Sequence, residues 1–271
     1  MNRIVLVSCG LIFCFQIAHS QIVKPKSFKN NVFGFGEELS YKATFLGMTA
    51  GKATTRVDKS QHKILGNTCY KIDVIGETSD WISWVTRVKD IWGAYIDTTQ
   101  FLTRATYRNI REGKYRKDEW VTFDHDAHQA SVQVIDKKTN KYKPAKVYPL
   151  PASTTDIVGG FMQLRFVDFD NIKKGDTISI IGFHEDASYP LKIAYMGKEV
   201  VKTKVGKIPC HVLTPKMPKN ELFDGTNSIS VWISDDKNKI PVKFSAKMFV
   251  GHTGIELTGF KGLKHGLKLV F

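Results

Sequence analysis

The centre of the chain reads STTDIVGGFMQLRF over residues 153–166 and has the pattern of an amphipathic helix. Its apolar residues recur at the i, i+4, i+7 spacing of a single helical face, formed by Ile157, Val158, Phe161 and Leu164. A hydroxyl of residues 153–155 is expected to cap the first turn, Asp156 to complement the positive end of the helix dipole, and Arg165 to complement the negative end. The sequence therefore predicts one helix over residues 154–166.

Most of the chain on either side alternates apolar and polar residues, as strands with one buried face do. Before the helix we expect strands at 38–45, 52–58, 70–74, 88–97, 101–112, 114–123 and 129–135. After it we expect 176–184, 189–195, 198–205, 210–215, 226–234, 239–250 and 253–260. Residues 80–85 could form a helical turn or the start of a strand.

The connections between these strands are short turns without crossover helices, which excludes a parallel sheet. We expect a mostly β protein with a large curved antiparallel sheet or half-open barrel around the central helix. Residues 37–271 would form a single β-rich domain, preceded by an N-terminal leader at 21–36.

The first twenty residues have the three parts of a signal peptide for export. Arg3 provides the positive start, residues 4–17 are apolar, and cleavage is expected before Gln21. The apolar run is too short to span a bilayer, and no later segment reaches the required length. An alternative is a lipoprotein signal ending at Cys9, although that cysteine comes very early in the chain.

Two cysteines, Cys69 and Cys210, remain after the predicted signal peptide. In an oxidising compartment they could form a disulfide, which would stabilise the fold by up to about 4 kcal/mol. The alternative is that both are buried free thiols.

The chain is basic, with a formal net charge of +14. This charge favours acidic partners such as lipid headgroups, lipopolysaccharide phosphates or acidic glycans. Export argues against a nucleic acid. Because the lysines and arginines are spread along the chain, a solvated basic exterior explains them better than a binding patch does.

The residues 229–250 suggest a ligand-binding surface. Ile229, Val231 and Ile233 are expected to face the core, which places Trp232 on the other face with Lys243, Lys247 and Phe249. An aromatic side chain among lysines suits an acyl or sugar ligand with an anionic group. The alternative is a structural tryptophan covered by the helix or by a loop.

Other polar groups have a structural and a functional interpretation. Arg108 is a candidate anion ligand, but a partly buried ion pair with Asp90 would explain it as well. Residues 235–239 could hold calcium, yet they suit a hairpin turn better. His125 and His128 could bind a transition metal, although a polar turn accounts for them and a zinc site needs more ligands.

Several pieces of the sequence resemble a family of exported bacterial proteins known as domain of unknown function 3108. These pieces are residues 36–41 with 47 and 50–51, 88–90 with 95–97, 107–113, Asp156 with 164–165, and 231–236 with 240–242. The helix departs from the family pattern, since a serine is common where Val158 and Gly159 stand. The resemblance implies a periplasmic or cell-surface β protein with a curved sheet similar to that of lipoprotein carriers.

Three functions remain open at this stage. The first is an exported, non-enzymatic protein that holds an amphipathic or anionic ligand, a lipid or a glycan, with the helix as plug or lid. The second is an envelope module that binds polysaccharide or protein, and the third is a carbohydrate-active enzyme. No catalytic motif, metal site or cofactor site is recognised. Trp81, Trp84, Trp120 and Trp232 should line a cavity in the first case and an exterior strip in the second.

Overall fold

The computed structural model describes residues 20–22, 30–83, 87–216, 228–249 and 251–271. The predicted signal peptide up to residue 19, Trp84 and the first residues of the strand predicted at 226–234 lie outside these ranges.

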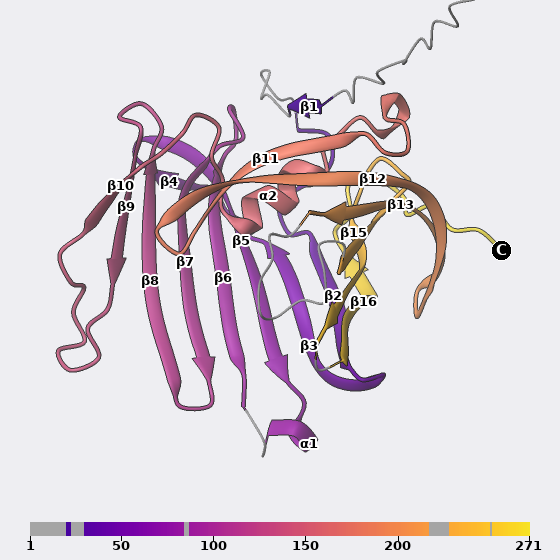
Figure 1. The fold of residues 1–271 in the computed structure, drawn as a ribbon, viewed down its shortest axis with the longest axis horizontal. Coiled ribbons are helices and arrows are strands. Elements are labelled where there is room, and N and C mark those ends of the chain that lie inside the picture. The colour runs from indigo at the N-terminus through magenta and orange to yellow at the C-terminus, as the bar shows by residue number, and fades with distance from the viewer. Residues whose placement is uncertain (1–19, 23–29, 84–86, 217–227, 250) are drawn as a thin grey trace, which may run out of the picture.

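The described residues form one large sheet (Figure 1). Before the central helix its strands are β1 (Ser20–Ile22), β2 (Glu38–Phe45), β3 (Met48–Val57), β4 (His62–Ile64), β5 (Asn67–Thr78), β6 (Lys89–Asp97), β7 (Thr103–Glu112), β8 (Tyr115–Asp124), β9 (Gln129–Val134) and β10 (Lys146–Pro149). After the helix they are β11 (Thr177–His184), β12 (Ala187–Thr203), β13 (Gly206–Pro215), β14 (Ile229–Ser234), β15 (Pro241–Met248) and β16 (Gly251–Lys261).

The strands follow the order β1-β11-β12-β13-β14-β15-β16-β2-β3-β5-β6-β7-β8-β9-β10, and β4 pairs with β5. Every pair is antiparallel except β1 with β11. The sheet is strongly curved. It is not closed into a barrel, because the two ends of this strand order do not pair with each other. The predicted fold class is confirmed. No helix among the described residues is long and apolar enough to cross a membrane.

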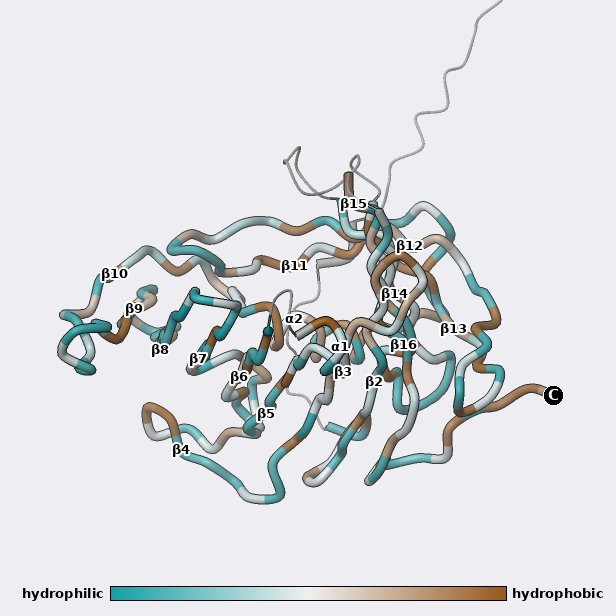
Figure 2. Tube along the Cα trace, turned by 90° about the horizontal axis from the view of Figure 1, so that it is seen from below, coloured by the Kyte–Doolittle hydropathy of each residue, from teal (hydrophilic) through white to brown (hydrophobic). Residues whose placement is uncertain are grey.

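The helices are α1 (Asp80–Ser83), α2 (Ile157–Leu164) and the short 3-10 helix η1 (Phe169–Asn171). Figure 2 shows α2 inside the curve of the sheet, between β2 to β8 on one side and β11 and β12 on the other. The helix contributes to two of the buried clusters: Leu164 packs with β11 to β15, and Val158 and Met162 pack with β5 and β6. The helix α2 therefore packs against the inner face of both halves of the sheet.

The structure corrects two details of the predicted helix. Asp156, and not one of the three preceding hydroxyl residues, is the N-cap, because its carboxylate accepts hydrogen bonds from the amides of Val158 and Gly159. Ile157 is 45% exposed and does not belong to the buried stripe, which is completed instead by Met162. The reason is the bowl shape of the sheet, which contacts α2 on more than one side.

A third correction concerns Met196 and Gly197, which the sequence suggests as a tight turn between two strands. The structure has one continuous strand, β12, with a bulge between Tyr195 and Gly197. Gly197 has a φ of +104°, a value that a turn and a bulge both demand and that glycine adopts readily. The bulge lets a strand of 17 residues bend around the end of the molecule.

Candidate functional site

A cavity of about 390 Å³ lies between α2 and the inner face of the sheet. The helix contributes Ile157, Val158, Phe161 and Met162, and the sheet contributes apolar side chains that include Tyr41, Ala53, Ile72, Val74, Trp92 and Phe244. The cavity exists because small or short residues, such as Ala53 and Val74, stand opposite a helix that is held away from them. Its size falls in the range of sites for small ligands, which is about 300–1,000 Å³.

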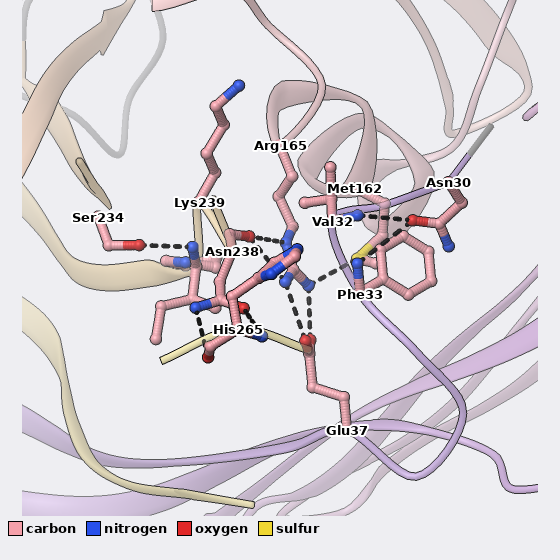
Figure 3. Close-up of polar contacts among 12 residues, drawn as sticks. Asn30, Val32, Phe33, Glu37, Met162, Arg165, Ser234, Asn238, Lys239 and His265 are labelled. Carbon is pink, nitrogen blue, oxygen red and sulfur yellow. Dashed lines mark hydrogen bonds and ion pairs between the residues drawn. The ribbon is translucent and has the colours of Figure 1, made fainter. Parts of the chain in front are cut away.

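The C-terminal end of α2 is fixed by a buried polar network (Figure 3). Arg165 donates hydrogen bonds to the carboxylate of Glu37 at 2.6 and 3.0 Å and to the backbone carbonyl of Asn238 at 3.0 and 2.9 Å. The side chain of Asn238 in turn binds the backbone of His265 on both its donor and acceptor sides. The predicted role of Arg165 at the helix dipole is therefore minor, because its charge is satisfied by Glu37.

The N-terminal end of α2 is fixed by the same residue that caps it. Besides the two amides, the Asp156 carboxylate accepts hydrogen bonds from the hydroxyls of Thr103 at 3.0 Å and Thr106 at 3.3 Å. Thr103 and Thr106 lie on β7, so the cap ties the helix to the sheet. Burial raises the pKa of Asp156 above its ordinary value. With both ends bound, α2 forms a rigid wall of the cavity.

Two charged side chains line the cavity, Arg165 and Lys243. Arg165 is neutralised by Glu37, whereas no carboxylate of the described residues lies within ion-pair distance of the Lys243 ammonium. Lys243 Nζ lies 4.9 Å from the ring centroid of Trp232. Lys243 is thus a lining residue whose ammonium lies against Trp232 and has no ion-pair partner among the described residues.

The structure brings together only part of the surface predicted around Trp232. Trp232 is half-buried beside Lys243, donates a hydrogen bond to Glu199 at 2.8 Å, and does not line the cavity. Lys247 and Phe249 are exposed near the end of β15, and Phe249 is in the turn that follows the strand. The residue that does line the cavity is Trp92, which the alternation of β6 places on the same face as Ala94.

Arg108 lies next to the cavity in a tight polar cluster. Its guanidinium pairs with Glu119 at 2.5 Å and with Glu185 at 2.8 Å, and packs over the ring of Trp92. The predicted pair with Asp90 is wrong, because the strand register sets Arg108 opposite Glu119 on β8 and opposite Trp92 on β6. The carboxylates of Glu119 and Glu185 both pair with Arg108. The pocket that these three residues line has a volume of only about 20 Å³.

A second aromatic group lies on the outer face of the sheet. Tyr95, Tyr107 and Trp120 come from three neighbouring strands, and the rings of Tyr107 and Trp120 stack with an interplanar angle of 6°. The hydroxyl of Tyr107 donates to Asp73, and Lys71 lies over its ring. The strand register brings the two rings together, because Tyr107 on β7 is directly opposite Trp120 on β8.

The remaining candidates have structural surroundings. His125 forms a hydrogen bond with the carbonyl of Thr103, and within the described ranges no three His, Cys, Asp or Glu side chains are placed to hold a metal. Residues 235–239 form a turn in which the Asp236 carboxylate accepts from the amides of Asn238 and Lys239. Cys69 and Cys210 are both buried and unpaired, which is the second of the two expected states.

Comparison with known proteins identifies relatives of this chain without assigning an activity. The model of a family described as Protein of unknown function (DUF3108) matches residues 40–258. No curated protein matches the chain.

The solved structures that are similar to this chain include two bacterial proteins. One is a beta-barrel-like protein of domain of unknown function DUF1849 from Brucella abortus, with 9% identity, 85% of this chain and 98% of that chain covered, and a TM-score of 0.54. The other is a protein with a YmcC-like fold from Bacteroides fragilis, with 9% identity, 84% and 97% covered, and a TM-score of 0.35. At this identity the first likeness concerns the fold alone.

Proposed function

We infer a function from two premises: the chain belongs to the DUF3108 family, and its curved sheet and central helix enclose a large apolar cavity. We propose that the protein is an exported, non-enzymatic binding protein that holds an amphipathic anionic ligand of the lipid class. The acyl part would occupy the cavity beneath α2. The single observation that carries this proposal is the apolar lining of a cavity of about 390 Å³.

The lining favours an acyl chain over a glycan. Hydrocarbon gains about 0.8 kcal/mol for each buried CH₂ group, so about ten such groups give a gross gain of about 8 kcal/mol before ordering costs. A sugar would instead lose hydrogen bonds to water and find few polar partners on this wall. The interior therefore suits the apolar portion of a ligand.

The charge of the wall suggests the sign of the ligand's polar end. Lys243 is the lining residue whose charge no described carboxylate neutralises, and the chain as a whole is strongly basic. An anionic headgroup beside Lys243 would complete an ion pair in a partly desolvated position, where such a pair is stronger than in water. We therefore assign Lys243 to the headgroup and α2 to the wall that covers the chain.

The test is to fill the cavity and measure binding. Ala53→Trp places a large side chain in the cavity, while Thr54→Trp places the same side chain one residue away on the outer face of β3. With a fluorescent long-chain fatty acid as the probe, Ala53→Trp should lose binding and Thr54→Trp should bind like the wild type. Lipid extraction of purified wild-type protein should release an amphiphile. Equal binding by the two variants would contradict the proposal.

A second candidate function is supported by the outer aromatic group. The planar surface of Tyr107 and Trp120, flanked by Asp73 and Lys71, suits stacking against a sugar of an envelope polysaccharide. In a gel that contains an acidic polysaccharide, the Trp120→Ala variant should then be retarded less than the wild type. The Ala53→Trp variant should be retarded as much as the wild type. Loss of the fatty acid by Ala53→Trp would support the lipid-binding function, and loss of the polysaccharide by Trp120→Ala would support the second function.

A further inference from the structure

Four large apolar side chains are exposed at one end of the sheet. Leu46 is 57% exposed, Met48 55%, Trp81 49% and Phe249 65%. They belong to three connections, the β2–β3 turn, α1 and the β15–β16 turn, which lie along the lower edge in Figure 1. We call these four residues the apolar rim.

Contacts between the connections show that they lie next to one another. The amide of Leu46 donates to the carbonyl of His252 at 2.9 Å, and a Cβ atom on Gly251 would overlap the Leu46 side chain. On the other side, Trp81 Nε1 donates to the carbonyl of Thr49 at 2.9 Å. The β2–β3 turn is therefore held between α1 and the β15–β16 turn.

The position of Leu46 is not explained by folding. Leu46 and Gly47 are the two central residues of a tight hairpin turn, with φ of +50° and +81°. Such turns favour asparagine at the first position, and a non-glycine residue with this backbone costs about 1–2 kcal/mol. Leucine here neither fits the backbone best nor buries its side chain. The same holds for Leu65 in the β4–β5 turn, so what sets Leu46 apart is its position near Met48, Trp81 and Phe249.

The charges around the rim indicate which kind of partner suits it. Exposed basic side chains lie on the same end of the sheet, in or beside its connections: Arg87, Lys89, Lys114, Arg116 and Lys247. Exposed acidic side chains there are fewer, namely Asp80 and Glu112, and Lys89 lies 3.8 Å from the carboxylate of Glu77. The chain carries a formal net charge of +14. Aromatic and aliphatic tips flanked by lysine and arginine are typical of protein surfaces that insert into the interface of an anionic bilayer.

The inner face of the sheet connects the rim with the cavity. Gly76 on β5 lies directly opposite Ala53, which lines the cavity. The next inward positions toward the rim are Ala43 on β2, Gly51 on β3 and Thr78 on β5. A Cβ atom at Gly76 would meet no other atom within 4 Å. The wall of the cavity thus continues toward the rim over small residues.

We propose that the apolar rim is a membrane-docking surface. Leu46, Met48, Trp81 and Phe249 insert into the interface of a bilayer with anionic headgroups, and the flanking basic residues contact the phosphates. Docking places the small-residue face between the bilayer and the cavity. This contact is independent of what the cavity holds, so it can be tested whether or not the proposed ligand is correct.

The chain provides a matched control for the test. Leu65 and Gly66 form a second tight turn, with φ of +48° and +77°, and Leu65 is 55% exposed. That turn lies between β4 and β5, at the opposite end of β5 from α1. Leu46→Asn and Leu65→Asn therefore make the same chemical change in the same kind of turn, at the rim and away from it.

The experiment is co-sedimentation of the full-length mature protein with two kinds of vesicle, phosphatidylcholine alone and phosphatidylcholine with phosphatidylglycerol. The wild type should bind the anionic vesicles and bind the neutral ones more weakly. Leu46→Asn and Phe249→Ser should each lower the partition constant by about tenfold, the change expected from withdrawing one large apolar side chain from the bilayer. Leu65→Asn should not change it.

The folded state must be intact for this comparison. Leu46→Asn relieves the backbone and should unfold at the same temperature as the wild type or a higher one, so lost binding cannot be ascribed to unfolding. The proposal is overturned if the wild type fails to bind anionic vesicles, or if Leu46→Asn and Leu65→Asn bind alike. It is also overturned if light scattering shows that the rim instead joins two copies of the chain and Leu46→Asn separates them.

Discussion

The guanidinium of Arg165 and the carboxylate of Glu37 form a two-pronged ion pair although each residue is only 1% exposed. The residues are 128 positions apart, and the pair joins the segment before β2 to the end of α2. The ring of Phe33 covers the guanidinium, with 5.2 Å between its centroid and Arg165 Cζ. This pair therefore helps to fix the C-terminal end of the helix that forms one wall of the cavity.

Glu37→Gln should destabilise the protein strongly. The substitution leaves the Arg165 charge buried without its counter-charge, and breaking such a pair from one side costs about 3–5 kcal/mol. The neighbouring Glu38 provides the control, because it pairs with Arg56 on the exposed face at 2.9 Å. Glu38→Gln should change the free energy of unfolding by at most about 1 kcal/mol. Urea unfolding of both variants measures the difference, and similar losses would mean that the buried pair has no special role.

Asp156→Ala should cost more than the loss of an ordinary helix cap. A cap contributes about 0.5–2 kcal/mol, and here the buried hydroxyl of Thr103 would also lose the carboxylate that accepts from it, so we expect about 2–4 kcal/mol. Asp168, the exposed N-cap of η1, is the matched control. Asp168→Ala should cost no more than about 1 kcal/mol. Thermal unfolding monitored by circular dichroism would show whether the two caps differ.

Much of the fold follows from local alternation, and this explains what the sequence could and could not predict. The strand expected at 38–45 coincides with β2, because the alternation of Leu39 and Tyr41 with polar neighbours is a local property. Met196 and Gly197 were misassigned because a glycine with positive φ suits a turn and a bulge equally. The short strand β10 has too few residues to show a period and was missed.

The candidate site was harder to predict because it depends on register and on empty volume. Arg108 meets Glu119 and not Asp90 only because β7 and β8 are aligned in one particular way. The cavity is the space left between α2 and residues such as Ala53 and Val74, which no short pattern encodes. Trp232 was chosen for its polar neighbours, whereas Trp92, with apolar neighbours, is the tryptophan of the cavity wall.

The contribution of His211 to stability should decrease as the pH falls. Burial lowers the pKa of His211 below its ordinary value, although Asp235 opposes the shift. The unfolded chain then takes up a proton near pH 6.5 while the folded protein does not, which favours unfolding below that pH. The two ring nitrogens of His211 lie 3.1 Å from the Tyr195 hydroxyl and 3.0 Å from the Asp235 carboxylate. In urea unfolding, the stability difference between wild type and His211→Gln should be larger at pH 7.5 than at pH 5.5. A difference that grows on acidification would contradict the lowered pKa.

The two cysteines should behave as inert thiols in the folded protein. Cys69 on β5 and Cys210 on β13 are each fully buried. Burial raises the pKa of the Cys69 thiol to about 11 and that of the Cys210 thiol to about 12. Because the thiolate is the reactive form, a disulfide-exchange reagent such as Ellman's reagent should react very slowly at pH 8. In urea without reductant, a chain that lacks residues 1–20, and with them Cys9 and Cys14, should react quickly at two thiols. If the unfolded chain released none, the cysteines would be joined in a disulfide, and β5 and β13 would have to lie closer together than they do here.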